Sequence, residues 1–135
     1  MCGIAGLTGP WGAALTAAMT EAVAHRGPDG HGAWSEDGVA LGHRRLSIID
    51  LSDAAAQPMQ TPDGRFVLTY NGEIYNYRDL RAGLEQAGVQ FRTGSDTEVL
   101  LHLLARDGLA CVEKLNGIFA FAIWDRETRT LSLAR

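Results

Sequence analysis

The sequence lacks the features that mark membrane, secreted and nucleic-acid-binding proteins. Its 135 residues contain no apolar run near the roughly 20 residues that cross a bilayer, and the N-terminus lacks the basic and apolar regions of a signal peptide. A net charge of −4 without any Lys/Arg cluster argues against nucleic acid or an anionic membrane as the main partner. We therefore expect a cytoplasmic protein that binds neither membrane nor nucleic acid.

Residues for metal, phosphate and disulfide chemistry are also scarce. The two cysteines, Cys2 and Cys111, lie far apart in the chain, so neither a disulfide framework nor a CxxC-type zinc site is expected. Asp29, Asp50 and Asp53 are not spaced like a metal site, and no glycine-rich phosphate loop is present. The sequence therefore predicts no metal and no cofactor in this chain.

The patterns that are present predict one layered domain with sheets inside and helices outside. Apolar residues make up 46% and charged residues 21%, as in globular domains. Apolar periodicity and turn residues predict helices over 15–23, 76–87 and from 96 onwards, and strands over 4–7, 32–34, 39–41, 66–70, 118–124 and 131–133. Residues 44–62 form a long irregular stretch, and long loops in compact domains are often functional.

Three local predictions can be checked directly. The first helix should bury the apolar face that includes Leu15 and Met19, because apolar residues recur there at helical spacing. The strand over 66–70 should stop at Asn71-Gly72. Ser95 and Glu98 have the spacing of a capping box, so a helix should begin near residue 96.

Cys2 has the clearest chemical potential of any side chain. If Met1 is removed, Cys2 carries both a thiol and a free α-amine, which together form a nucleophile and its base. This is the N-terminal-residue version of the Ser–His arrangement. Taken alone, a cysteine in second position is more often an ordinary residue, so the neighbouring motifs have to decide.

Two further groups of residues fit the same chemistry. Asn71-Gly72 could present an amide side chain and an unhindered N–H group to a developing oxyanion, although Asn-Gly is also a common hairpin turn. Arg44-Arg45 and Asp96 could together bind the two charged ends of a free amino acid, although a surface Arg and a helix-capping Asp are the simpler interpretation. His43 lies among strand-like residues and is not expected to act as a base.

Six short motifs occur in a fixed order and cover nearly the whole chain. They are Met1–Gly6, His25–Gly30, His43–Asp50, Tyr70–Asn76, Thr93–Asp96 and Leu115–Phe121. Together they resemble the N-terminal glutaminase domain of glutamine-hydrolysing asparagine synthetases, a class II (N-terminal-nucleophile, Ntn) glutamine amidotransferase. The segments over 45–50 and 71–76 favour this branch over the sugar-phosphate and purine-pathway branches.

The resemblance implies an α+β class with the four-layer αββα Ntn hydrolase fold, and it assigns the site residues. Cys2 is implied as the nucleophile, with Asn71 and Gly72 as the oxyanion hole. Arg45 would hold the glutamine carboxylate, and Glu73 and Asp96 its ammonium group. The remaining glutamine-pocket residues would be Leu46, Ser47, Ile48 and Ile49.

The same resemblance implies what lies outside these residues. Relatives continue into further strands and a synthetase domain that uses ATP and Mg, so residues 1–135 are expected to be a C-terminally truncated glutaminase domain. Glutamine would be its substrate, and the synthetase domain, in cis or in trans, its partner; a homodimer is a further expectation. The ammonia would go to an activated acceptor such as aspartate. Two alternatives remain: a natural-product amidotransferase with another acceptor, and a non-catalytic scaffold, which would not need Cys2 or Asn71.

Overall fold

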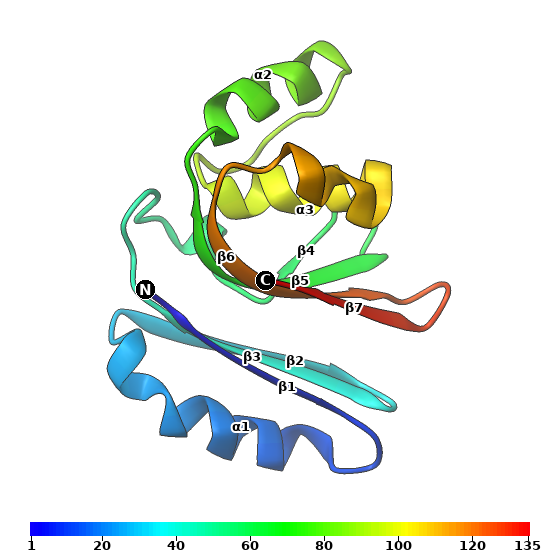
Figure 1. Ribbon diagram of the computed structural model, residues 1–135. Coiled ribbons are helices and arrows are strands. Elements are labelled where there is room, and N and C mark those ends of the chain that lie inside the picture. The colour runs from blue at the N-terminus through cyan, green and yellow to red at the C-terminus, as the bar shows by residue number, and fades with distance from the viewer.

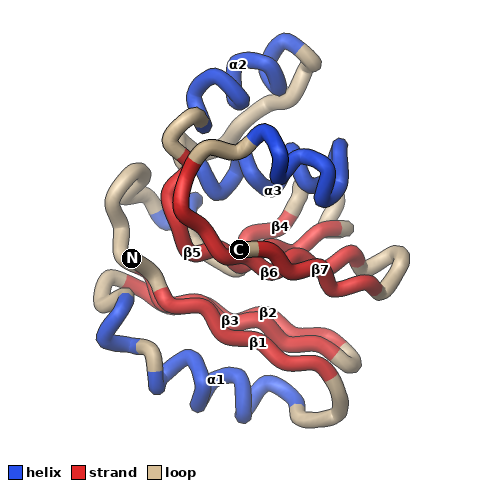
Figure 2. Tube along the Cα trace, in the orientation of Figure 1, coloured by secondary structure: helices blue, strands red, loops and turns tan.

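Two antiparallel sheets face each other, and helices cover both outer faces (Figure 1). The computed structural model describes residues 1–135. The first sheet has the strand order β1-β3-β2 and the second the order β4-β5-β6-β7. Figure 2 shows helix α1 on the outside of the first sheet and helices α2 and α3 beyond the second. The predicted α+β class and four-layer arrangement are therefore confirmed.

The chain contains three α-helices, three 3₁₀ turns and seven strands. The helices are α1 (Gly12–Ala22), α2 (Tyr77–Gln86) and α3 (Asp96–Asp107). Short 3₁₀ turns cover Ala24–Arg26, Asp53–Ala55 and Gly108–Lys114. The strands are β1 (Gly3–Thr8), β2 (Gly30–Glu36), β3 (Val39–Arg45), β4 (Met59–Gln60), β5 (Phe66–Ile74), β6 (Gly117–Asp125) and β7 (Thr130–Ala134). No helix is both long enough and apolar enough to cross a membrane.

The main core lies between the second sheet and α3. Leu68 and Ile74 of β5 and Leu100 of α3 are fully buried in it, together with Phe121 of β6. The predicted capping box begins α3 as expected, because the Ser95 hydroxyl accepts a hydrogen bond from the Glu98 N–H at 3.3 Å. The core thus fixes the N-terminal end of α3 beside the second half of β5.

Strand β5 is longer than predicted. It does not stop at Asn71-Gly72 but continues to Ile74, with Asn71 opposite Ala120 and Gly72 opposite Phe119 of β6. A β-carbon at position 72 would lie 2.3 Å from the Ile118 carbonyl oxygen. Glycine is therefore needed here for close strand packing and not for a turn, which is why a turn-forming dipeptide lies inside a strand.

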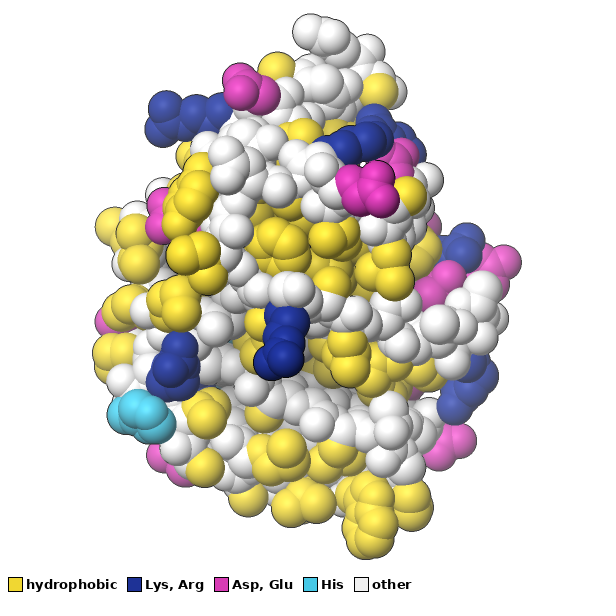
Figure 3. All heavy atoms as spheres, in the orientation of Figure 1, with side chains coloured by type: hydrophobic (Ala, Val, Ile, Leu, Met, Phe, Trp, Pro, Cys, Tyr) yellow, Lys and Arg dark blue, Asp and Glu magenta, His cyan; other side chains and the backbone are white.

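Helix α1 buries a different face from the predicted one. Thr16 and Thr20 are buried against the first sheet, while Leu15 is 46% and Met19 38% exposed. The reason lies in β3, where a β-carbon at Gly42 would lie 2.0 Å from the Thr20 hydroxyl oxygen. The helix approaches so closely that only short side chains fit, and the longer apolar residues point outward. Figure 3 shows hydrophobic side chains gathered over this outer side of α1.

The second sheet ends in an open edge. Strand β7 pairs only with β6, and Leu133 on it is 67% exposed. A hollow of about 330 Å³ between the sheets is lined by β1 and β7 residues, including Ile4, Leu7 and Leu131. An unpaired strand edge beside apolar surface favours pairing with another chain.

We expect this chain to self-associate through the open edge of β7 at high concentration, and we expect Leu133→Lys to reduce that association. A charge on the open edge disfavours edge-to-edge pairing and should move the protein towards monomer in size-exclusion chromatography at high concentration. Thr128→Lys is the matched control, because it adds the same charge in the turn before β7. Equal elution of the wild type and Leu133→Lys, or an equal effect of the control, would contradict the role of this edge.

Candidate active site

A cavity of about 300 Å³ opens where the start of β1, the loop after β3, the second half of β5 and the start of α3 meet. Nine of the ten predicted site residues line it; Asn71 does not. Gln57, Tyr70 and Tyr75 also contribute to its wall. The nine are Cys2, Arg45, Leu46, Ser47, Ile48, Ile49, Gly72, Glu73 and Asp96.

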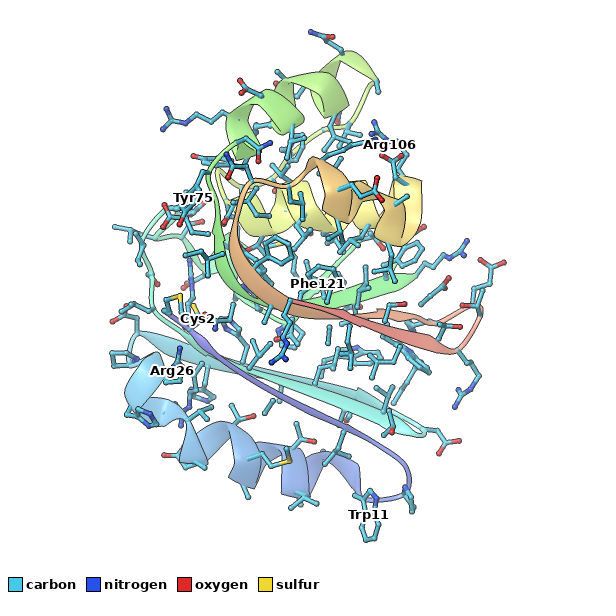
Figure 4. All side chains as sticks on the ribbon, viewed as in Figure 1. Cys2, Trp11, Arg26, Tyr75, Arg106 and Phe121 are labelled. Carbon is cyan, nitrogen blue, oxygen red and sulfur yellow. The ribbon has the colours of Figure 1, made fainter.

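Cys2 lies directly before β1, between the two sheets (Figure 4). Its Sγ accepts a hydrogen bond from the Leu46 N–H at 3.3 Å, and its carbonyl oxygen accepts one from Arg26 Nε at 3.0 Å. An N–H group in this position stabilises negative charge on the sulfur. Because Met1 precedes Cys2, the Cys2 nitrogen is a peptide nitrogen until Met1 is removed.

The open edge of β5 presents one free N–H group to the cavity. The Tyr70 N–H donates to Gln57 Oε1 at 2.6 Å, and the Ile74 N–H donates to Asp96 Oδ2 at 3.1 Å. Backbone N–H groups two residues apart in a strand point to the same side. The Gly72 N–H therefore points to the same side as the N–H groups of Tyr70 and Ile74, which already have side-chain acceptors. This is the geometry of an oxyanion donor.

The Asn71 side chain lies on another side of the strand. Side chains alternate along β5, and the Thr69 hydroxyl donates to the Gly42 carbonyl of the first sheet, so Asn71 also faces that sheet. Its Oδ1 is buried and has no hydrogen-bond partner. The two predicted oxyanion donors thus point in different directions, and only Gly72 borders the cavity together with Cys2.

Arg45 fixes the loop that forms one wall of the cavity. Its Nη1 donates to the Ser52 carbonyl at 2.9 Å, and its Nη2 donates to the Asp50 carbonyl. Asp50 Oδ2 in turn accepts from the Gly94 N–H at 2.7 Å, which ties the loop to the turn before α3. A guanidinium has five N–H donors, so Arg45 retains donors for a ligand.

Arg44 points away from the cavity. Its guanidinium forms an ion pair with Glu21, and its Nε donates to the Thr20 carbonyl of α1 at 3.3 Å. The two adjacent arginines therefore have separate roles, one towards α1 and one at the cavity. Successive residues of β3 face opposite sides of the sheet, which explains the difference.

Asp96 is the first residue of α3 and is 5% exposed. Its Oδ2 accepts from the Tyr70 hydroxyl at 2.7 Å as well as from Ile74. Burial raises the pKa of this carboxyl, and the hydrogen bond from Tyr70 opposes the rise. Glu73, which also lines the cavity, is exposed. The cavity thus holds a cationic group, Arg45, and carboxylates on other walls.

His43 does not border the cavity. It is buried on β3, and its Nε2 lies 3.2 Å from the Tyr70 carbonyl oxygen. Burial lowers the pKa of His43 to about 4, so the ring is neutral near pH 7. This agrees with the prediction that His43 is not the base for Cys2.

Comparison with known proteins identifies the family. The family model of the glutamine amidotransferase domain matches residues 1–135. The chain belongs to this glutamine amidotransferase family. Glutamine-hydrolysing asparagine synthetase 3 of Bacillus subtilis (strain 168) is 46% identical over 119 residues, which are 87% of this chain and 19% of the relative. The resemblance inferred from the motifs is therefore confirmed.

Two further relatives extend the comparison. Amidase chry2 of Gibberella zeae is 42% identical over 115 residues, which are 84% of this chain and 17% of the relative. A similar solved structure is that of glutamine phosphoribosylpyrophosphate amidotransferase from B. subtilis in complex with ADP and GMP. The two chains superpose with a TM-score of 0.56 and 31% sequence identity, and the match covers 67% of this chain and 22% of that one. The chain spans about a fifth of the length of these relatives.

Three residues that organise this candidate site were given no role in the sequence analysis. Gln57 and Tyr70 line the cavity and hold its edge, and Asp50 ties its loop to the turn before α3. Only Asp50 carries a local indication, because Ser52 two residues later donates to its side chain from both N–H and hydroxyl. The contacts of Gln57 and Tyr70 join segments far apart in the chain.

Proposed function

We propose that this domain hydrolyses L-glutamine to glutamate and ammonia through a thioester on Cys2. The proposal rests on one observation: four groups border the same cavity. They are the Cys2 thiol, the edge of β5 at Gly72, and the charged side chains of Arg45 and Asp96. A volume of about 300 Å³ suits a small ligand. Groups of both charges suit the two charged ends of a free amino acid.

The chemistry follows from these positions once Met1 is removed. The Cys2 α-amine accepts the thiol proton, and the sulfur attacks the carboxamide carbon of glutamine. The oxyanion that forms accepts a hydrogen bond from the Gly72 N–H. The C–N bond then breaks, and the proton held by the amine leaves with ammonia. Water attacks the glutamyl thioester, which releases glutamate and restores the Cys2 thiol.

A direct experiment tests this function. Protein whose intact mass shows the loss of Met1 should release ammonia and glutamate from glutamine in equal amounts, and acid quenching should trap a glutamyl adduct on Cys2. A processed, folded protein that releases no ammonia would refute the proposal. It would instead support the scaffold alternative.

We expect Arg45→Ala to weaken glutamine binding more than turnover. The contact of Arg45 with the α-carboxylate would exist both in the bound substrate and in the transition state, so its loss should raise KM roughly tenfold or more with a smaller change in kcat. Arg44→Ala is the matched control, because Arg44 is bound to α1 and does not line the cavity. A change in kcat alone for Arg45→Ala would contradict the assignment.

For the ammonia, we propose transfer to an activated acceptor on a synthetase domain in cis or in trans, with aspartate as the acceptor. The support is the similarity to asparagine synthetases, of whose length this chain spans about a fifth. ATP and Mg would act in that domain, and the glutaminase step would need no cofactor. The relative named an amidase supports the alternative of another acceptor. Residues 1–135, given aspartate, glutamine, ATP and Mg, should yield free ammonia and no asparagine.

A further inference from the structure

Tyr70 is a buried residue at the border of the cavity that is fixed by hydrogen bonds. It is 2% exposed, and each of its polar groups has a partner from a different segment. Its N–H donates to Gln57, its carbonyl oxygen lies 3.2 Å from His43 Nε2, and its hydroxyl donates to Asp96 Oδ2 at 2.7 Å. A buried tyrosine held in this way fixes the groups that it contacts.

The hydroxyl of Tyr70 acts on the carboxylate assigned to the substrate ammonium. Asp96 Oδ2 receives two hydrogen bonds, from Tyr70 and from the Ile74 N–H, and these fix the orientation of the carboxylate. We propose that Tyr70 is a positioning residue of this site, whose hydroxyl orients the Asp96 carboxylate towards the α-ammonium group of glutamine. The inference rests on the proposed glutamine-binding function and adds a residue to it.

The charge state of Asp96 gives the proposal a distinctive consequence. Burial raises the pKa of Asp96, and the Tyr70 hydrogen bond favours the ionised carboxylate. Loss of the hydroxyl should raise the pKa of Asp96 further, so glutamine binding should be lost at a higher pH as the solution is acidified. The other residues with titratable or charged groups on the cavity wall are Met1, whose amino terminus is charged, Cys2, Arg45, Asp50, Glu73 and Tyr75.

The experiment measures ligand binding by calorimetry in the Cys2→Ala chain, so that it does not depend on turnover. The ligands are glutamine and glutaramate, which is glutamine without its α-amino group. Tyr70→Phe should weaken glutamine binding roughly tenfold, because a hydrogen bond to a charged group is lost, and should leave glutaramate binding nearly unchanged. The pH below which glutamine no longer binds, which is the acidic limit of binding, should be higher in Tyr70→Phe. Tyr77→Phe is the control, because the Tyr77 hydroxyl accepts only from Arg78 outside the cavity.

Two results would overturn the proposal: unchanged glutamine affinity in Tyr70→Phe, or equal losses for both ligands. Asp96→Asn tests the same pair without altering Tyr70, since the amide oxygen still accepts from the hydroxyl while the charge is lost. It should weaken glutamine binding selectively and remove the acidic limit, and equal losses for both ligands would again overturn the proposal. Glutamine hydrolysis by the Cys2 chain is measured in parallel, so failure of the proposed function is seen separately.

Discussion

Replacing Cys2 with alanine is expected to lower ammonia release from glutamine by more than about 10³-fold while leaving the fold intact. No other side chain on the cavity wall combines a strong nucleophile with an adjacent base. Cys111, the other thiol of the chain, is 0% exposed in the main core. Burial also raises the pKa of Cys111, which disfavours its thiolate.

Two matched variants make this prediction specific. Cys111→Ala should keep glutaminase activity, because it removes a thiol that does not reach the cavity. Cys2→Ser should still bind glutamine but lose most turnover, since an alcohol is a weaker nucleophile than a thiol near neutral pH. Ammonia release by processed Cys2→Ala at the wild-type rate would exclude the thioester mechanism.

The sequence was most informative where function depends on local chemistry. Cys2 and the capping box at Ser95 were both predicted from a few adjacent residues. The structure places Cys2 on the cavity wall and Ser95 at the start of α3. The irregular stretch predicted over 44–62 is shorter in the structure, because β3 extends to Arg45 and Met59–Gln60 form β4. The first half of the connection between these strands lies on the cavity wall. Short motifs therefore identified many of the residues that line the cavity.

The sequence was less informative where distant segments determine the outcome. The apolar spacing of α1 indicates a buried Leu15 and Met19, but the approach of Gly42 in β3 favours burial of the short Thr16 and Thr20. Periodicity within one helix cannot report how closely a sheet approaches it. For the same reason, an Asn-Gly pair that suggests a turn lies within a strand, since β6 continues the pairing beyond it.

The side-chain direction of Asn71 is a further case. From the sequence, Asn71 and Gly72 were expected to converge on one point, but the Gly72 N–H lies in the plane of the sheet at its edge, whereas the Asn71 side chain stands out from the face of the sheet. In the structure, the Gly72 N–H lies at the open edge of β5, whereas the Asn71 side chain faces the first sheet. Cys2 directly precedes β1 of that sheet. Both groups can therefore act on one oxyanion only if the Asn71 side chain reaches the Cys2 sulfur from the space between the two sheets.

We expect Asn71→Ala to lower kcat by about 10²–10³-fold with little change in KM, because a donor to the oxyanion acts in the transition state and not on bound glutamine. Asn76→Ala is the matched control. The Asn76 side chain joins the Lys114 carbonyl to the Asn116 N–H outside the cavity, so its loss should lower the melting temperature and leave kcat unchanged. Steady-state kinetics on processed protein measure both variants. A raised KM with normal kcat in Asn71→Ala would assign the residue to substrate binding, and normal values of both would leave Gly72 as the oxyanion donor without Asn71.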